Sequence, residues 1–402
     1  MDSLSQLTLG AAVGELVLGR KLGNRAMVWG AIAGTIPDLD VVGNYFMSDL
    51  DGLLFHRGIS HSIFFSVIGA ILFGLLIYTI YNSPYHKWIA TVSKVLSVLL
   101  VLKVVHFLAS IFNFYPIIVV LLAAPLLFAP LYYSVKTKYF SSAWEKPEAS
   151  KLDWINLFFW AFATHILLDC FTLYGTQVFA PFSNYKVMWG SISVVDPLYT
   201  LPLLVLLICA SRFNRSEHKR RILNNTGLLI SSLYLMFTLY NRHCVYNHFQ
   251  NEFTQAGLEV YNYSISAVLF SNVLWSCTAE TNDFFYIGDY SQFDEVPVSF
   301  YEIDKNHQLL KNIDTDPTIK ALRWFSDDYF CITESEEGLL FNDLRFGMYT
   351  DRKGKPAGFI FSFLLIDQGD KGYLMKKTQR GPNSDDRNSF FSNLWKRIKG
   401  KK

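Results

Sequence analysis

The sequence has few charged residues and lacks the common motifs of soluble enzymes. Charged residues make up 17% of the 402-residue chain, against roughly 25% in an average globular protein, whereas hydrophobic residues make up 51%. A net charge of +2 is too small to indicate a nucleic-acid partner. No phosphate-cradling glycine loop, GxSxG elbow or HExxH motif occurs. The sequence therefore argues against P-loop enzymes, α/β-hydrolases and zincin proteases.

Cysteine is also scarce, and its spacing is uninformative. The five cysteines show no CxxC pattern, which argues against a zinc knuckle and against a disulfide framework. Cys277 and Cys331 could pair only if their domain lies outside the cytoplasm. No basic segment followed by a cleavable apolar stretch is present, so we expect no removed signal peptide.

Long hydrophobic runs dominate the first 240 residues. A spanning helix needs about 20 apolar residues, and six runs have about this length: 61–81, 89–109, 116–135, 152–171, 193–211 and 222–241. Residues 4–18 and 25–37 are shorter and rich in Gly and Ala, which let helices approach closely in lipid. The sequence predicts an α-helical polytopic membrane bundle of about eight segments over residues 1–242, beginning with a tight helical hairpin.

Basic loops predict the orientation of this bundle. The strongest basic cluster lies between the last two runs, at Arg212, Arg215, Lys219, Arg220 and Arg221. Short positive loops stay in the cytoplasm. Alternating eight segments from this loop puts most of the acids and histidines of the apolar region at the outer ends of their helices. We therefore expect these ionisable residues to share one site at the outer face.

The last third of the chain changes character. Residues 243–375 contain short stretches rich in aromatic and β-branched residues, bounded by Gly, Asp, Asn and Pro. This pattern predicts a small β-rich extracytoplasmic domain. The basic tail, 376–402, is expected to be disordered, with contact to anionic lipids as the alternative.

Ionisable residues in apolar segments are candidates for a functional site, because burying them in hydrocarbon is costly. His165 and Asp169 have the i,i+4 spacing that places both side chains on one helix face, where they could chelate a divalent ion. The alternative is a simple His–Asp hydrogen bond inside the bundle.

Two further pairs have metal-ligand chemistry. His56 and His61 flank a short connection in which Gly58 permits a turn toward a common point. Asp38 and Asp40 follow Pro37 at the end of a helix, where the partial negative charge of the helix terminus makes a bound cation favourable. Interfacial histidines and an exposed acidic loop are the alternatives.

Three more residues are candidates for catalytic roles. Asp196 could act as a general base or orient another group, or it could simply cap a helix that has Pro197 at its first position. Arg57 could stabilise an anionic transition state, or pair with Asp40 or a lipid phosphate. Glu15 lies inside the small-residue hairpin, where it could serve the site or pair with a buried basic group.

Taken in order, these motifs resemble the YdjM-like family, described as LexA-binding, inner-membrane-associated metal-dependent hydrolases. The resemblance covers about residues 1–210. It rests on Asp2-Ser3-Leu4-Ser5-Gln6, Pro37-Asp38-Leu39-Asp40, His56-Arg57-Gly58, Ser60-His61-Ser62, His165 to Asp169, Tyr174-Gly175, Pro181-Phe182-Ser183 and Asp196-Pro197.

The resemblance implies a polytopic inner-membrane hydrolase. Six positions fall on the family's acidic and histidine motifs: Asp38, Asp40, His56, His61, His165 and Asp169. Some relatives carry a histidine near the N-terminus where this chain has Gln6, a poorer metal ligand.

We expect a metal-dependent hydrolase with its site at the outer face of the inner membrane. A mixed nitrogen and oxygen ligand set suits zinc and is compatible with manganese or iron. The expected partners are membrane lipids and an amphiphilic or lipid-linked ester or phosphoester substrate, with no nucleic acid. The alternative is a non-enzymatic protein, either a cation-binding transporter or a partner-binding scaffold with a structural metal.

Overall fold

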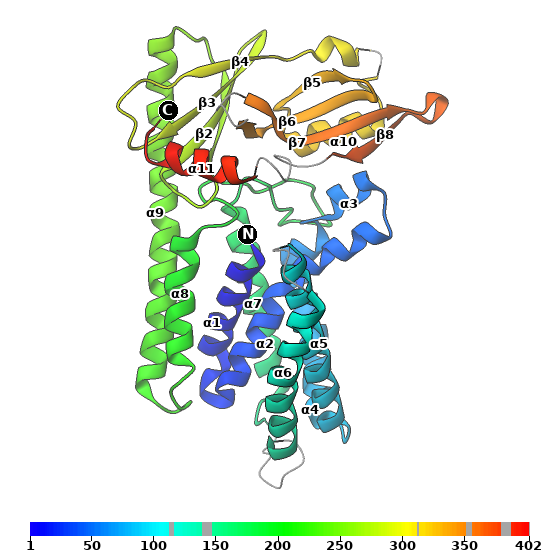
Figure 1. Ribbon diagram of the computed structural model, residues 1–402, viewed down its shortest axis with the longest axis vertical. Coiled ribbons are helices and arrows are strands. Elements are labelled where there is room, and N and C mark those ends of the chain that lie inside the picture. Colours follow the sequence, from blue (N-terminus) through cyan, green and yellow to red (C-terminus); the bar gives the residue numbers. More distant parts are fainter. Residues whose placement is uncertain (112–115, 139–146, 312, 351–355, 379–386, 402) are drawn as a thin grey trace. The chain divides into compact units, whose positions relative to one another are not determined.

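The chain forms a helical N-terminal part followed by a C-terminal domain of two antiparallel sheets (Figure 1). This computed structural model describes residues 1–111, 116–138, 147–311, 313–350, 356–378 and 387–401. The chain divides into two compact units. One contains Met1–Gly69 and Leu157–Lys402, and the other contains Ala70–Asn156. The division falls within two helices, α4 (Ile63–Asn82) and α7 (Lys151–Cys170).

All eight apolar segments expected from the sequence are helical. Besides α4 and α7 they are α1 (Ser3–Leu22), α2 (Asn24–Thr35), α5 (His86–Ile111), α6 (Pro116–Lys138), α8 (Pro197–Ala210) and α9 (His218–Ala256). Among the described residues, only α4 and α9 are long and apolar enough to cross a membrane, and α8 is a shorter apolar helix. The polytopic bundle is therefore not confirmed beyond these two candidate spans.

The hairpin of α1 and α2 is held by direct backbone contact. A Cβ atom built on Gly10 would lie 2.3 Å from the carbonyl oxygen of Gly30, and one built on Gly14 would lie 2.3 Å from that of Ala26. Both distances are far below any van der Waals contact, so only glycine permits this approach. The tight small-residue hairpin predicted from the sequence is confirmed.

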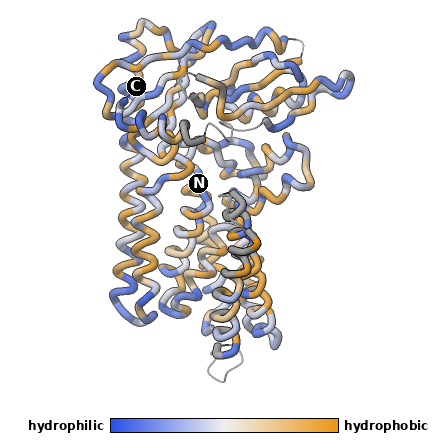
Figure 2. Tube along the Cα trace, viewed as in Figure 1, coloured by the Kyte–Doolittle hydropathy of each residue, from blue (hydrophilic) through white to orange (hydrophobic). Residues whose placement is uncertain are grey.

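Helix α9 has two different halves. With 39 residues it is about 58 Å long, roughly twice the thickness of a bilayer's hydrocarbon core. Leu229, Leu233 and Phe237 are exposed along its first half, whereas Phe249 and Phe253 are buried in the core of the first sheet. Figure 2 shows the apolar first half after the hydrophilic turn that follows α8. One continuous helix thus joins the apolar part of the chain to the β domain.

Two four-stranded antiparallel sheets make up this domain, each with its strands in sequence order. The first contains β1 (Asn262–Ala267), β2 (Leu274–Glu280), β3 (Phe284–Ser291) and β4 (Phe300–Asp304), and the second contains β5 (Phe330–Ser335), β6 (Gly338–Thr350), β7 (Pro356–Asp367) and β8 (Tyr373–Lys377). Helix α10 (Pro317–Ser326) covers the second sheet with Ile319, Leu322 and Phe325. Cys277 and Cys331 lie in different sheets, and both are free thiols.

The prediction of a fully disordered tail is wrong. Residues Arg387–Ile398 form helix α11. Arg397 makes a bidentate ion pair with Asp294, and the backbone carbonyl of Ile398 accepts a hydrogen bond from Ser291 Oγ. The many charged residues of the tail predicted disorder. The helix is held by a partner about 100 residues away in the chain, which local composition does not reveal.

The hairpin contact makes a direct prediction about stability. Gly30→Val forces a side chain into the backbone of α1, and overpacking of this kind costs about 1–3 kcal/mol or more. We expect a lower midpoint of thermal unfolding in detergent than for wild type. Val28, which is 56% exposed on the same helix, provides the control: Val28→Ile should leave the midpoint unchanged. Equal midpoints for Gly30→Val and wild type would contradict the close packing.

Candidate metal centre

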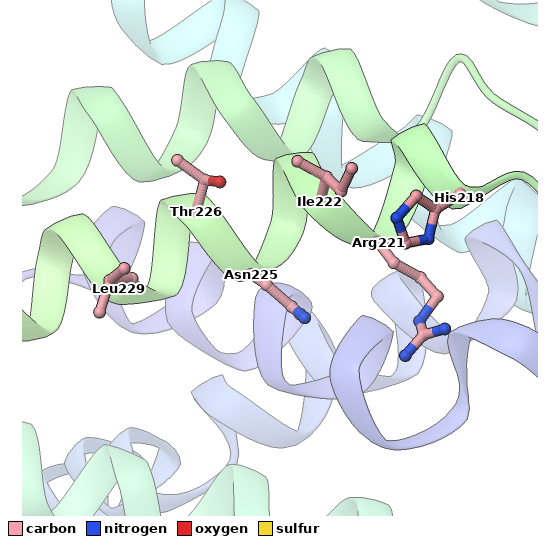
Figure 3. Close-up of a pocket in the computed structure, with 6 residues that line it drawn as sticks. All are labelled: His218, Arg221, Ile222, Asn225, Thr226 and Leu229. Carbon is pink, nitrogen blue, oxygen red and sulfur yellow. The ribbon is translucent and has the colours of Figure 1, made fainter.

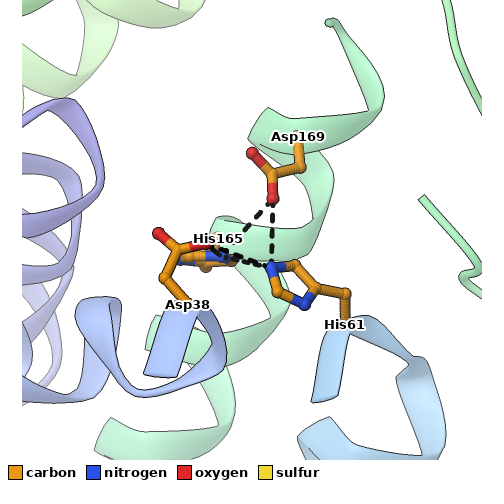
Figure 4. A group of neighbouring side chains, drawn as sticks. All are labelled: Asp38, His61, His165 and Asp169. Carbon is orange, nitrogen blue, oxygen red and sulfur yellow. Dashed lines mark hydrogen bonds and ion pairs between the residues drawn. The ribbon is translucent and has the colours of Figure 1, made fainter. Parts of the chain in front are cut away.

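Three elements bring acids and histidines together. The 3-10 helix η1 (Pro37–Tyr45) carries Asp38 in its first turn, a second 3-10 helix, η2 (Ile59–His61), ends at His61, and α7 carries His165 and Asp169 one turn apart. Figure 4 shows the four side chains pointing toward one another. One ligand atom from each lies within 4.8 Å of the other three. Residues from three separate stretches of sequence therefore form one cluster, named here the four-residue centre.

Distances within the four-residue centre match a small coordination sphere. The Nε2 atoms of His61 and His165 are 3.2 Å apart. Asp38 Oδ1 lies 3.3 and 3.6 Å from these two nitrogens, and Asp169 Oδ2 lies 3.3 and 3.5 Å from them. Tetrahedral sites with ligand bonds of about 2.0–2.2 Å have ligand atoms about 3.3–3.6 Å apart. The five distances that involve an imidazole nitrogen are therefore compatible with a divalent-ion site, and the two carboxylate oxygens lie within 4.8 Å of each other.

Hydrogen bonds on the far sides of the rings set the imidazole tautomers. His165 Nδ1 lies 2.7 Å from the carbonyl oxygen of Gly34, which can only accept, so this nitrogen carries the proton. His61 Nδ1 faces Ser60 Oγ at 3.0 Å and Asp40 Oδ2 at 3.3 Å. With a metal ion bound, both rings would be neutral and would direct the lone pair of Nε2 into the centre. Such outer partners orient metal-binding histidines in many proteins.

The donor set concentrates acidic groups in a buried space. Two imidazole nitrogens and two carboxylates converge, and among the described residues no hydrogen-bond donor is assigned to the buried Asp169 Oδ2. His61, His165 and Asp169 have fully buried side chains, whereas that of Asp38 is 22% exposed. Burying acceptors without a donor costs several kcal/mol in general. The residues fit a divalent metal ion, with Asp38 on the side open to solvent.

The other oxygen of Asp169 is held by positively polarised groups. Asp169 Oδ1 accepts a hydrogen bond from Gln6 Nε2 at 3.0 Å and another from the amino group of Met1. Arg57 Nη2 forms an ion pair with the same oxygen at 3.2 Å. Gln6 thus lies against the centre without being one of its four ligands.

Arg57 is the second charged group of this region. Its side chain is buried, with Nη1 donating to Thr172 Oγ1 and the guanidinium 5.0 Å from the ring centroid of Tyr174. The backbone of Arg57 has φ +59°, in the left-handed region. A non-glycine residue there carries strain of order 1–3 kcal/mol. The expected turn includes Gly58 as well, because its NH donates to the carbonyl of Phe55 and a Cβ atom there would lie 2.9 Å from that oxygen.

Asp40 and His56 lie beside the four-residue centre rather than in it. Asp40 accepts from the backbone NH of Arg57 at 2.9 Å and from Ser60 Oγ at 3.0 Å, and it lies 2.8 Å from His56 Nδ1. Burial alone would raise the pKa of Asp40, but the contacts with His56 and His61 hold it well below its ordinary value. Asp40 is thus an anion that orients His61.

Two predicted residues have other partners. Asp196 caps α8 by accepting from the NH groups of Leu198 and Tyr199, and it also accepts from Tyr234 Oη. Glu15 makes a bidentate pair with Arg220 at 2.6 Å. Within the described part of the chain, neither acid has a hydrogen bond or ion pair with the four-residue centre. The capping and buried-pair alternatives are therefore confirmed.

Sequence reasoning missed several contributors to the centre. Thr172 holds Arg57, the carbonyl of Gly34 sets the tautomer of His165, and Gln6 holds Asp169. Of these residues, only Gln6 could have been linked to the centre from the sequence, because some relatives carry a histidine near this position. A backbone carbonyl such as that of Gly34 leaves no side-chain pattern at all.

A separate pocket of about 280 Å³ lies on the first turns of α9 (Figure 3). Its lining residues are His218, Arg221, Ile222, Asn225, Thr226 and Leu229. None of them belongs to the four-residue centre.

The geometry defines a class of protein: a helical protein with candidate membrane spans, a buried His–Asp cluster that could hold a metal ion, and an appended β domain. The chain belongs to the family of YdjM inner membrane proteins, whose family model matches residues 1–121 and 117–245. No significant match is found among the curated proteins or the solved structures compared with it.

Substitutions at the centre should change metal content. We expect wild-type protein, purified in detergent and incubated with zinc or manganese, to retain the metal, and His61→Ala with Asp169→Ala to lose it. Asp40→Asn should weaken affinity about 10–100-fold, because the partner that orients His61 is lost. Elemental analysis and metal titration are the measurements.

His243→Ala is the matched control, since this histidine is exposed on α9 and should not affect metal content. Equal, negligible metal in wild type and the double variant would contradict a metal centre.

Proposed function

We propose that the protein is a membrane-bound, metal-dependent hydrolase. The observation that carries this proposal is the convergence of two imidazole Nε2 atoms and two carboxylates, with one carboxylate reaching solvent. Membership of the YdjM inner membrane protein family supports a membrane location for such a centre. A bound divalent ion, with zinc the first candidate and manganese or iron the others, would polarise the scissile bond and lower the pKa of a bound water.

The protein groups around the centre have complementary tasks in this proposal. His61, His165 and Asp169 would hold the cation from the buried side. Asp38, on the solvent side, would in this proposal accept the proton of the attacking water instead of closing the site as a fourth ligand. This role belongs to Asp38 rather than to Asp196, whose carboxylate is occupied as a helix cap.

Arg57 supports an anionic substrate. Its Nε is buried and has no hydrogen-bond partner among the described residues, and its guanidinium lies beside Asp169. A free N–H of a buried guanidinium can donate to a phosphate oxygen. We therefore place a lipid-linked phosphoester first among the substrates and an acyl ester or amide second.

The proposed topology follows the positive-inside rule. The helical part would cross the inner membrane several times, with the basic turn before α9 in the cytoplasm. The centre and the β domain would then face the outer side. An amphiphilic substrate could reach such a centre from the adjacent leaflet.

A partner-binding scaffold with a structural metal is the second candidate, because four protein ligands can close a tetrahedral site. The two functions predict different effects of substituting Asp38. In a closed structural site, Asp38→Asn should lower thermal stability and metal retention together. In the hydrolase, Asp38→Asn should abolish turnover while His61, His165 and Asp169 still retain the metal.

The test is hydrolysis by the metal-loaded protein in nanodiscs. We expect headgroup release from a panel of phospholipids, measured by mass spectrometry, with loss of at least about 100-fold in rate for His165→Ala and for Asp38→Asn, since base catalysis typically contributes 10²–10⁴-fold. Arg57→Lys should impair phosphoesters more than acyl esters. His243→Ala should retain full activity. No hydrolysis of phosphoesters, esters or amides by protein with full metal content would contradict the proposal.

A further inference from the structure

Helix α11 presents an exposed aromatic and basic face. Phe391 is 49% exposed and Trp395 is 59% exposed, and their i,i+4 spacing places both on the same side of the helix. Lys396 and Lys399 are also exposed, and Lys399 Nζ lies 4.9 Å from the ring centroid of Trp395. Aromatic and lysine side chains on one face are typical of helices that lie in a membrane interface.

The C-terminal turn fixes α11 to the β domain. Ile398 is buried at the end of the helix and its carbonyl accepts from Ser291 Oγ. Arg397, on the side away from Trp395, pairs with Asp294 through both of its terminal nitrogens. Arg397 Nη2 also donates to the carbonyl of Asp289 at 2.6 Å. The exposed side chains of Phe391 and Trp395 are therefore held in one orientation.

Contacts place one end of α11 beside the start of α8 and the other beside the end of the apolar stretch of α9. Near its N-terminal end, the Phe391 ring lies 6.1 Å from that of Phe270, whose backbone NH donates to the carbonyl of Val195, just before α8. The exposed apolar side chains of α8 begin directly after this point, at Leu198.

The other end of α11 lies by α9. Gly400 is packed against Phe293, and the neighbouring Gln292 donates to Asn241 of α9 at 2.5 Å. Asn241 directly follows Tyr240, the last exposed residue of the apolar stretch of α9, which is 66% exposed. Phe293 itself is 62% exposed. Thus α11 lies beside the β-domain end of the exposed apolar stretches of both α8 and α9 (Figure 1).

We propose that α11 is an interfacial anchor that lies on the lipid surface on the β-domain side and sets the height of this domain above the bilayer. Phe391, Trp395 and Phe293 enter the headgroup region, and Lys396 and Lys399 contact anionic lipid phosphates. The occupant of this face is the bilayer itself. A second protein chain is the competing occupant, and the experiment separates the two.

The test uses full-length protein in nanodiscs of phosphatidylcholine and phosphatidylglycerol. The fluorescence of Trp395 is obtained as the difference between wild type and Trp395→Phe. With lipids brominated near the carbonyl end of the acyl chains, we expect this difference signal to be quenched at least about twofold. Aqueous iodide should quench it little. Lys396→Glu with Lys399→Glu should reduce the bromolipid quenching when phosphatidylglycerol is present but not in phosphatidylcholine alone.

A matched control uses an exposed aromatic position elsewhere in the domain. Tyr301 is 48% exposed on β4, which lies on the side of the domain away from α11 (Figure 1). Tyr301→Trp in the Trp395→Phe background should respond to iodide and not to bromolipid. If Trp395 responds to iodide alone, the anchor is disproved. If it responds to neither quencher, a protein partner covers the face and the proposal is equally overturned.

Discussion

The Nε2 atoms of His61 and His165 face each other 3.2 Å apart, and the groups around the two rings are arranged to hold them in this position. The outer nitrogen of His165 donates to a backbone carbonyl, and that of His61 faces Ser60 and Asp40, so the inner nitrogens present lone pairs. Two carboxylates are added to this concentration of negative potential. A buried arrangement of this kind needs positive charge nearby. Arg57 and the amino group of Met1 supply it on one side of Asp169, and a divalent ion could supply it among the four side chains.

The packing of the first two helices serves this centre. Glycine contacts bring α1 and α2 together, and the end of α2 supplies the carbonyl of Gly34 to His165. From α1, Gln6 donates to Asp169 and to the carbonyl of His165. The close approach of two backbones is therefore connected to the orientation of His165 and Asp169 on α7, through two hydrogen bonds from Gln6 and one accepted by Gly34.

The candidate site was predictable to a limited depth. The i,i+4 pair on α7 follows from helix geometry alone, and the acids after Pro37 and the histidines around Arg57 stood out as ionisable groups near apolar segments. Spacing could not distinguish Asp38, which enters the centre, from Asp40, which orients His61, because the two are separated by only one residue. The left-handed backbone of Arg57 had no sequence signal, because the neighbouring Gly58 is the residue to which a turn is ordinarily assigned. The helix in the basic tail was missed because its stability depends on Asp294 and Ser291.

By itself the sequence determined the apolar helices, the glycine hairpin, the β-rich character of the last third and the ionisable residues from which a site had to be made. These properties depend on local composition and periodicity, which act over one or a few turns. Only the tertiary structure decided which acids and histidines meet, which nitrogen of each imidazole faces inward, and that Asp196 and Glu15 serve as a cap and an ion-pair partner. Those outcomes depend on contacts between segments up to about 200 residues apart, and the energy of such contacts is set by distance and burial that no local pattern contains.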